Sequence, residues 1–237
     1  MDLIGESEVV YLDKGRQVEK GVLVREKLAM MLVFLFVAAI AVAEEKARKR
    51  TILFLGDSLT SGYGLSAEVA FPAVIQAKID SLGLGYKVVN AGISGETTSA
   101  GLSRMNWMLK RRIDVLVIEL GANDGLRGVP LKVTRQNLQA IVDSSRKAYP
   151  KVNVVLAGIQ VPPNLGPEYT SEFKEIFPDL ATKNKVALIP FLLEGVGGIQ
   201  EFNLADGIHP TVAGHRKVAE NVWKVLGPLL SDDSQQQ

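Results

Sequence analysis

The sequence predicts a single α/β domain in which helices flank a five-stranded parallel sheet. From residue 51 onward, short apolar runs rich in β-branched residues alternate with segments of helical periodicity. The apolar runs are nearly continuous, which is typical of parallel strands covered on both faces. No internal repeat and no shift in composition follows residue 50, so a second domain is not expected.

Each element of this fold follows from its own stretch of sequence. The expected strands are 51–56, 86–90, 114–120, 153–159 and 186–190. The expected helices are 69–82, 98–111, 132–148, 168–184 and 211–227. Lys147 and Lys183 fall in last turns of these helices, where a cation complements the helix dipole. The polar final residues, 231–237, are expected to be disordered.

Residues 1–43 are interpreted as a leader that precedes the domain. An unbroken apolar run of sixteen residues, 28–43, follows a basic flank at Lys27. As a helix this run spans about 24 Å, short of the roughly 30 Å hydrocarbon core of a membrane. Small residues close the run, so we expect cleavage after Ala43 and a periplasmic or secreted domain at 44–230.

The alternative is an uncleaved membrane anchor through 28–43, because basic residues also follow the run, at 46–50. In that case the leader is the only part of the chain expected to contact a membrane. Residues 1–27 are long and mixed in charge for the start of a signal peptide. This indicates an over-extended start, with Met30 or an earlier non-Met codon as the expected true start.

Composition excludes several classes of function. The 27 basic and 26 acidic residues leave a formal net charge of +1 with no evident basic patch, so we expect no nucleic-acid partner. A chain without cysteine has no disulfide, cysteine nucleophile, thiolate metal site or iron–sulfur cluster. Two histidines, His209 and His215, exclude a histidine-rich zinc site and leave two candidates for a catalytic base.

The loops that follow the strands carry the candidate chemistry, because ligands bind outside the carboxyl ends of the strands in open α/β sheets. Ser58 follows the first strand in the turn 56–60 (GDSLT), a position that suits an exposed nucleophile or, alternatively, a helix cap. After the second strand, the glycines of 92–98 allow backbone amides to face a ligand. That segment serves equally well as a turn with Ser94 or Thr97 as the cap.

Two later loops supply an amide and an acid–base pair. Asn123 can donate a hydrogen bond to developing negative charge, although Asn-Asp-Gly is also turn chemistry. Asp206 stands three residues before His209, where a carboxylate can orient the imidazole for proton transfer. His215 falls among the apolar positions of the last expected helix and is interpreted as packing or surface. Together with Ser58, these groups form the set that acyl transfer requires.

These residues resemble the SGNH hydrolases, also called the GDSL family of esterases and lipases. The matching blocks are Gly56-Asp57-Ser58-Leu59, Ile93-Ser94-Gly95, Gly121-Ala122-Asn123-Asp124 and Asp206-Gly207-Ile208-His209-Pro210. The blocks occur in the family's order, and the similarity runs from 51 to 230. Segments 121–128 (GANDGLRG) and 160–169 (QVPPNLGPEY) are similar to the arylesterases and to the periplasmic acyl-CoA thioesterase/lysophospholipase group within the family.

The resemblance implies a flavodoxin-like, three-layer α/β/α sandwich and a serine hydrolase that needs no metal and no organic cofactor. Ser58 would attack the acyl carbon, His209 would take its proton and Asp206 would hold the imidazolium. The oxyanion would be held by the Ser58 and Gly95 amides and the Asn123 side chain. The expected substrate is a small acyl ester or thioester.

The loop after the fourth strand, with Pro162 and Asn164, is expected to line the acyl pocket. A carbohydrate acetylesterase is the nearest rival function, although Trp107 and Trp223 fall on helical patterns that favour packing over sugar stacking. A non-catalytic flavodoxin-like protein that binds a flavin or nucleotide is a rival of another class. Such a protein needs a phosphate-binding loop after the first strand. Residues 56–62 at that place include an acid, Asp57, and no Lys or Arg, which disfavours this rival.

Overall fold

The computed structural model describes residues 27, 30–34, 36–37 and 48–235, and the chain divides into two compact units, residues 1–48 and 49–237. In the first unit, residues 30–34 and 36–37 are helical and exposed. The expected cleavage point after Ala43 and most of the expected leader lie outside the described residues. Among the residues that are described, no helix is long and apolar enough to cross a membrane.

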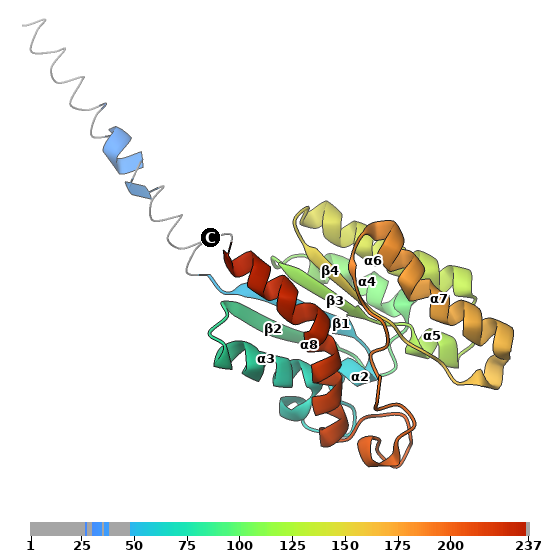
Figure 1. Ribbon diagram of the computed structural model, residues 1–237. Helices are drawn as coiled ribbons and strands as arrows, with labels where there is room; N and C mark the ends of the chain where they lie inside the picture. The colour runs from blue at the N-terminus through green and yellow to red at the C-terminus, as the bar shows by residue number, and fades with distance from the viewer. Residues whose placement is uncertain (1–26, 28–29, 35, 38–47, 236–237) are drawn as a thin grey trace, which may run out of the picture. The chain divides into compact units, whose positions relative to one another are not determined.

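In the described part of the second unit, five parallel strands form one sheet in the order β2-β1-β3-β4-β5 (Figure 1). The strands are β1 Arg50–Gly56, β2 Tyr86–Gly92, β3 Val115–Glu119, β4 Asn153–Ala157 and β5 Ala187–Ile189. This is the strand order of flavodoxin-like folds, which bind ligands where the order reverses, beside β1. The predicted fold class is therefore confirmed.

Helices cover both faces of the sheet and make it the middle of three layers (Figure 1). On one face, α3 (Phe71–Ser81) packs against α8 (Val212–Gln235). On the other face, α6 (Leu131–Ala148) packs between α4 (Thr98–Met108) and α7 (Pro167–Asn184). Each of these helices begins within two residues of its predicted start.

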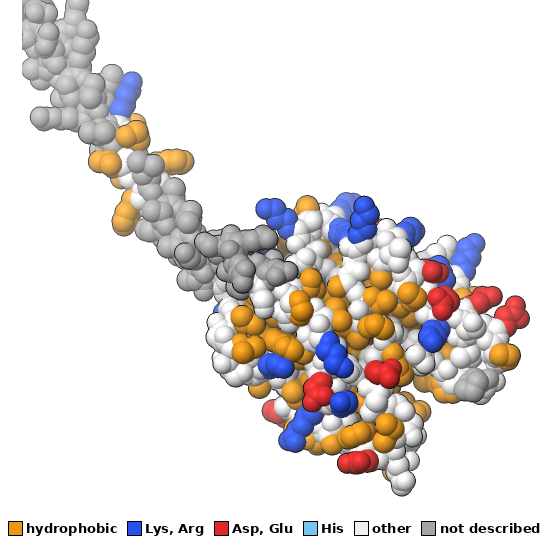
Figure 2. Space-filling model, viewed as in Figure 1, with side chains coloured by type: hydrophobic (Ala, Val, Ile, Leu, Met, Phe, Trp, Pro, Cys, Tyr) orange, Lys and Arg blue, Asp and Glu red, His pale blue; other side chains and the backbone are white. Residues whose placement is uncertain are grey.

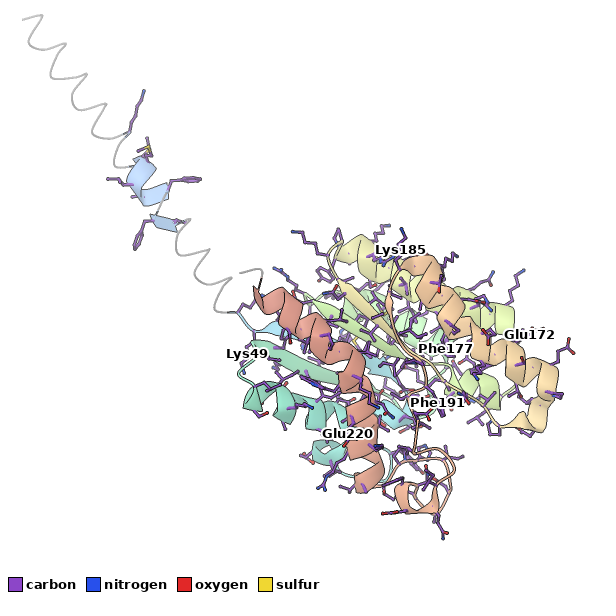
Figure 3. All side chains as sticks on the ribbon, in the orientation of Figure 1. Lys49, Glu172, Phe177, Lys185, Phe191 and Glu220 are labelled. Atoms are coloured by element: carbon purple, nitrogen blue, oxygen red, sulfur yellow. The ribbon has the colours of Figure 1, made fainter. Side chains whose placement is uncertain are left out.

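The hydrophobic core lies between the sheet and the two helix layers. The central strands β1, β3 and β4 are almost wholly buried, as their continuous apolar sequences predict, whereas the outer strands β2 and β5 are only partly buried. Phe177 of α7, labelled in Figure 3, is among the buried aromatic side chains. On the face seen in Figure 2, basic and acidic side chains are interspersed around α8, where Lys217 pairs with Glu220 at 3.1 Å.

Two short helices replace turns that the sequence predicts. They are α2 (Ser58–Ser61) and α5 (Ala122–Leu126). Asp57 caps α2, since its carboxylate accepts the amide of Leu59 at 3.0 Å, and the helix ends at Gly62 in the left-handed conformation, with φ of 80°. Turn and cap residues are the same residue types, so the sequence did not separate the two. Three 3₁₀ helices complete the described elements: η1 Ala67–Val69, η2 Pro163–Leu165 and η3 Gln200–Phe202.

The last helix is longer than predicted. We expected a helix to 227 and disorder from 231, but α8 continues to Gln235 with Pro228 inside it. A proline in a helix removes one backbone hydrogen bond and usually marks an end. Here Leu226 and Leu230, on either side of Pro228, are fully buried, so continuing the helix keeps both side chains in the core.

The two tryptophans differ in environment. Trp223 of α8 packs against the core, and the Lys78 ammonium lies 4.9 Å from its ring centre. Trp107, near the end of α4, is 63% exposed, so the prediction that it packs inside the fold was wrong. Because α4 follows β2, its end lies at the amino ends of the strands, opposite the edge where ligands bind in this fold.

Candidate active site

The loops at the carboxyl ends of β1, β2 and β3 carry three of the predicted site residues, Ser58, Gly95 and Asn123. The loop before α8 carries His209 to the same edge, where its imidazole meets Ser58 from 151 residues away in sequence. The sheet thus brings the sequence-predicted groups together beside β1, where the strand order reverses.

Ser58, His209 and Asp206 form a continuous hydrogen-bonded chain. His209 Nε2 lies 2.9 Å from Ser58 Oγ, and His209 Nδ1 lies 2.7 Å from Asp206 Oδ2. The other carboxylate oxygen, Asp206 Oδ1, accepts the amides of Ile208 at 2.9 Å and His209 at 3.0 Å. The His209 and Ile208 amides and the imidazole lower the pKa of Asp206 to about 2, so this carboxylate is ionised near neutral pH.

Glycines let the loops approach closely at this edge. A side chain on Gly56, the last residue of β1, would meet Glu119 Oε2 at 2.6 Å and also the Thr60 hydroxyl. A side chain on Gly92, the last residue of β2, would collide with the backbone of α2. Gly121 has a φ of 125° and lies against the Phe177 ring. These positions fix the backbone of the nucleophile loop against its neighbours.

The Ser58 and Gly95 amides are available to a ligand. Within the described chain, neither amide nitrogen has a hydrogen-bond partner. Gly95 adopts a φ of 80°, and its carbonyl accepts Arg127 Nη2 at 2.9 Å, which ties this loop to the end of α5. Ser94, the preceding residue, has its hydroxyl 3.2 Å from that of Ser61 on α2.

The Asn123 side chain is at the predicted place but already has partners. Its Nδ2 donates to Asp57 Oδ2 and to the Glu96 carbonyl, each at 3.1 Å. Glu96 is in turn held in an ion pair with Arg104 on α4. An amide nitrogen has two hydrogens, so donation to an oxyanion would replace or share one of these bonds.

Beneath Ser58 lies a buried pair of carboxyl groups that sequence reasoning missed. Asp57 and Glu119 are both fully buried, Glu119 Oε2 accepts the Asp57 backbone amide at 3.2 Å, and the two carboxyl groups act on each other electrostatically. Burial raises the pKa of Asp57 to about 6, and burial together with the Asp57 charge raises the pKa of Glu119 well above its ordinary value. The available signal was Glu119 itself, an acid inside the apolar run of residues 115–120.

Tyr63 is a second residue that the sequence did not single out. Its ring lies against the His209 imidazole, with the ring centres 4.4 Å apart and the planes at 39°. The Tyr63 amide also donates to the Ser58 carbonyl at 3.1 Å. Tyr63 therefore contacts both ends of the serine–histidine pair.

The predicted acyl-pocket residues and His215 lie on later elements, at η2 and on α8. Pro162 is exposed just before η2 and Asn164 is exposed within it, and no contact with Ser58 or His209 is found for them in the described chain. His215 is buried on α8, where its Nδ1 accepts the Phe71 amide at 3.3 Å, so the packing interpretation is confirmed. Among the described residues, no cluster of three or more His, Cys, Asp or Glu side chains is placed to hold a metal ion.

Known proteins resemble this chain over nearly all of its second unit. Esterase TesA of Pseudomonas aeruginosa is 42% identical over 193 residues, which is 81% of this chain and 95% of TesA. An arylesterase of Vibrio mimicus is 38% identical, covering 84% and 97% of the two chains. The Escherichia coli protein named thioesterase 1/protease 1/lysophospholipase L1 is 40% identical, covering 78% and 86%.

A solved structure agrees with these sequence matches. The crystal structure of TesA matches with a TM-score of 0.73 at 42% identity, covering 76% of this chain and 99% of that one. The sequence profile of the GDSL-like Lipase/Acylhydrolase family matches residues 54–217, which include Ser58, Asn123 and His209. The chain therefore belongs to the GDSL-like lipase/acylhydrolase family, as its four sequence blocks predicted.

Proposed function

We propose that this hydrolase cleaves carboxylic esters and thioesters through an acyl-enzyme formed on Ser58. The observation that carries the proposal is the chain from Asp206 through His209 to Ser58, with its two contacts of 2.7 and 2.9 Å. A serine hydroxyl is a weak nucleophile by itself, and the imidazole is the adjacent base that activates it.

In the acylation step, Ser58 Oγ attacks the acyl carbon and its proton passes to His209 Nε2. The imidazolium that forms faces the Asp206 carboxylate, whose pKa of about 2 keeps it anionic at working pH. This carboxylate accepts Nδ1–H, which fixes the tautomer that leaves Nε2 free to take a proton. His209 then protonates the leaving alcohol or thiol.

Negative charge on the carbonyl oxygen of the tetrahedral intermediate needs donors beside Ser58. The Ser58 and Gly95 amides serve this role because both lack an internal partner. The Asn123 amide is the third donor, and it turns one N–H from the Glu96 carbonyl toward the oxyanion while keeping its bond to Asp57.

Deacylation reuses the same groups. Neutral His209 takes a proton from water, the resulting hydroxide attacks the acyl carbon, and the second tetrahedral intermediate expels Ser58 Oγ. His209 returns the proton to Ser58, so no group is consumed. The described residues supply every proton transfer in the cycle.

The substrate proposed is a small acyl ester or thioester with an apolar portion. Three large apolar side chains are about half exposed next to site residues: Tyr63, Ile93 and Ile208. Pro162 and Asn164 are proposed to extend this surface along the acyl chain. The relatives named esterase, arylesterase and thioesterase 1 support this substrate class. The acetylesterase alternative has less support, because exposed Trp107 is at the far end of the strands from Ser58.

We further propose that residues 1–43 are removed on export and that 44–230 is the periplasmic or secreted hydrolase domain. The apolar run at 28–43 and the small residues that close it support this assignment. N-terminal sequencing of the protein recovered from the periplasm or medium tests it. A first residue at Glu44 supports cleavage, whereas recovery of the intact chain in membranes supports the anchor.

The catalytic proposal is tested with a panel of p-nitrophenyl esters, acyl-CoA and lysophospholipid, and by fluorophosphonate labelling. Ser58→Ala and His209→Ala should each lower kcat by at least about 10⁴-fold, and Ser58→Ala should abolish labelling. Ser103→Ala is the matched control, since Ser103 is exposed on α4, where its hydroxyl donates to the Ala100 carbonyl at 2.7 Å, and the change should leave both readouts intact. Turnover by Ser58→Ala at the wild-type rate would rule out this mechanism.

A further inference from the structure

The catalytic scheme above leaves Glu119 without a role, although it lies directly under the nucleophile. Glu119 ends β3 and is fully buried. Its Oε2 accepts the Thr60 hydroxyl at 2.7 Å and the Asp57 amide at 3.2 Å. Its Oε1 is equally buried, and no donor among the described residues points at it. A buried oxygen without a donor is costly unless it carries its own proton and donates it.

Asp57 is the acceptor for that proton. Its backbone amide is held by Glu119 Oε2, so the two carboxyl groups are neighbours, and its carboxylate accepts the amides of Leu59 at 3.0 Å and Asn123 at 3.1 Å. Apart from Glu119, the titratable group that acts on Asp57 is His209. Arg104 of α4 is paired with Glu96. Two carboxyl groups in contact, both buried and without a paired cation, do not ionise together.

The distribution of donors decides which carboxyl group is the anion. Asp57 receives two N–H donors besides its contact with Glu119, and a carboxylate that accepts several donors is favoured as the charged form. Glu119 has an oxygen to which nothing donates. We propose that Glu119 is a positioning residue that stays protonated and donates its proton to Asp57, which holds Asp57 as the anion that caps the Ser58 helix and orients Asn123.

This arrangement matters for catalysis because Asp57 is the acceptor for Asn123 Nδ2. A neutral Asp57 that carried the shared proton would be a weaker acceptor, both for Asn123 and for the amide of Leu59. The NH₂ group of Asn123 would then be held less firmly by Asp57 and would lose its fixed orientation toward the oxyanion. Glu119 thus acts through Asp57, and its effect on rate rests on the proposed roles of Ser58 and Asn123.

The site of the proton is measured directly by infrared difference spectroscopy at neutral pH. Wild type minus Glu119→Gln should contain the C=O stretching band of a protonated carboxyl group, which the variant lacks. Glu96→Gln is the matched control: Glu96 is also buried but is paired with Arg104, so its difference spectrum should contain only carboxylate bands. A wild-type spectrum without a protonated-carboxyl band, or a band lost only in Asp57→Asn, would overturn the assignment.

Kinetics supply a second readout that a purely structural residue would not give. Glu119→Gln keeps a donor for Asp57 and an acceptor for Thr60, so its kcat should stay within about threefold of wild type. Glu119→Met has similar size but no donor, so kcat should fall about 10- to 100-fold with little change in KM, the equivalent of one charge-assisted hydrogen bond. The acid limb of the pH–rate profile of Glu119→Met should also move to higher pH, because Asp57 without this donor takes up a proton more readily.

The two readouts remain informative if one variant fails. Should Glu119→Met not fold, the infrared band and the activity of Glu119→Gln still decide the proposal. An inactive Glu119→Gln that folds, with a thermal unfolding midpoint like that of wild type, would show that the ionised carboxylate is required and would refute it. The infrared result does not depend on turnover, so failure of the Ser58 mechanism is distinguishable from failure of this inference.

Discussion

The Tyr63 ring lies against the imidazole of His209, with the ring centres 4.4 Å apart. In the proposed mechanism His209 becomes positively charged as Ser58 attacks, so the face of an aromatic ring beside it would stabilise the transition state more than the ground state. Such a contact at an exposed position contributes about 0.5–1 kcal/mol, which corresponds to a two- to fivefold change in rate.

Tyr63→Ala should therefore lower kcat by about two- to fivefold, whereas Tyr63→Phe, which keeps the ring, should retain wild-type kcat. The measurement is steady-state hydrolysis of a short p-nitrophenyl ester at neutral pH. Equal losses in the two variants would assign the effect to the hydroxyl group and not to the ring face.

Asp206→Asn should lower kcat by about 10³- to 10⁴-fold, because an amide in place of the carboxylate favours the wrong tautomer of His209 and gives no stabilisation to the imidazolium. The substituted side chain still fits the loop, so thermal unfolding should report a folded protein. A variant that keeps more than a tenth of wild-type kcat would show that Asp206 is not the group that orients His209.

The lowered pKa of Asp206 also has a consequence for stability. Its folded value of about 2 lies below its ordinary value of 3.8, so the folded state binds the proton less readily than the unfolded state. The stability that Asp206 contributes is present above pH 3.8 and is lost as the pH falls toward 2. Between pH 4 and 2, the thermal unfolding midpoint of wild type should therefore fall further than that of Asp206→Asn.

The sequence predicted that Ser58, Asp206 and His209, the proposed triad, would meet, because each lies in a block whose local chemistry indicates its role. Ser58 follows a buried strand, and Asp206 stands three residues before His209. The contacts of Glu119 were not predictable in this way, since they depend on the register that pairs Gly56 of β1 with Glu119 of β3. The stacking of Tyr63 on His209 likewise depends on where the loop before α8 returns to the sheet.

Asn123→Ala should lower kcat by about 10²- to 10³-fold with little change in KM, because the donor is needed most when the oxyanion forms. The same substitution removes a hydrogen bond from the buried Asp57 carboxylate, so unfolding free energy should fall by about 1.5–3 kcal/mol. Affinity for a boronic acid transition-state analogue separates the two effects, since it should weaken in parallel with kcat. A loss confined to KM would argue against the oxyanion role.

His215 should make the protein less stable in mild acid. Burial, followed by the charge of His209, lowers its pKa from 6.5 to about 4, and its Nε2 is buried without a hydrogen-bond partner in the described chain. Below pH 6.5 the unfolded chain binds a proton at His215, whereas the folded protein binds that proton only at about pH 4. The stability contributed by neutral His215 is complete above pH 6.5 and declines by about 3 kcal/mol on the way to pH 4.

His215→Asn tests this, because asparagine keeps an acceptor for the Phe71 amide and does not titrate. Urea unfolding at pH 7 and pH 4 should show that the stability advantage of wild type over the variant shrinks by about 3 kcal/mol at the lower pH. Asp57 acts in the opposite direction, since its raised pKa of about 6 adds stability as the pH falls through that value. That contribution is common to both proteins and cancels in the difference. A difference that is independent of pH would mean that His215 titrates alike in the folded and unfolded states.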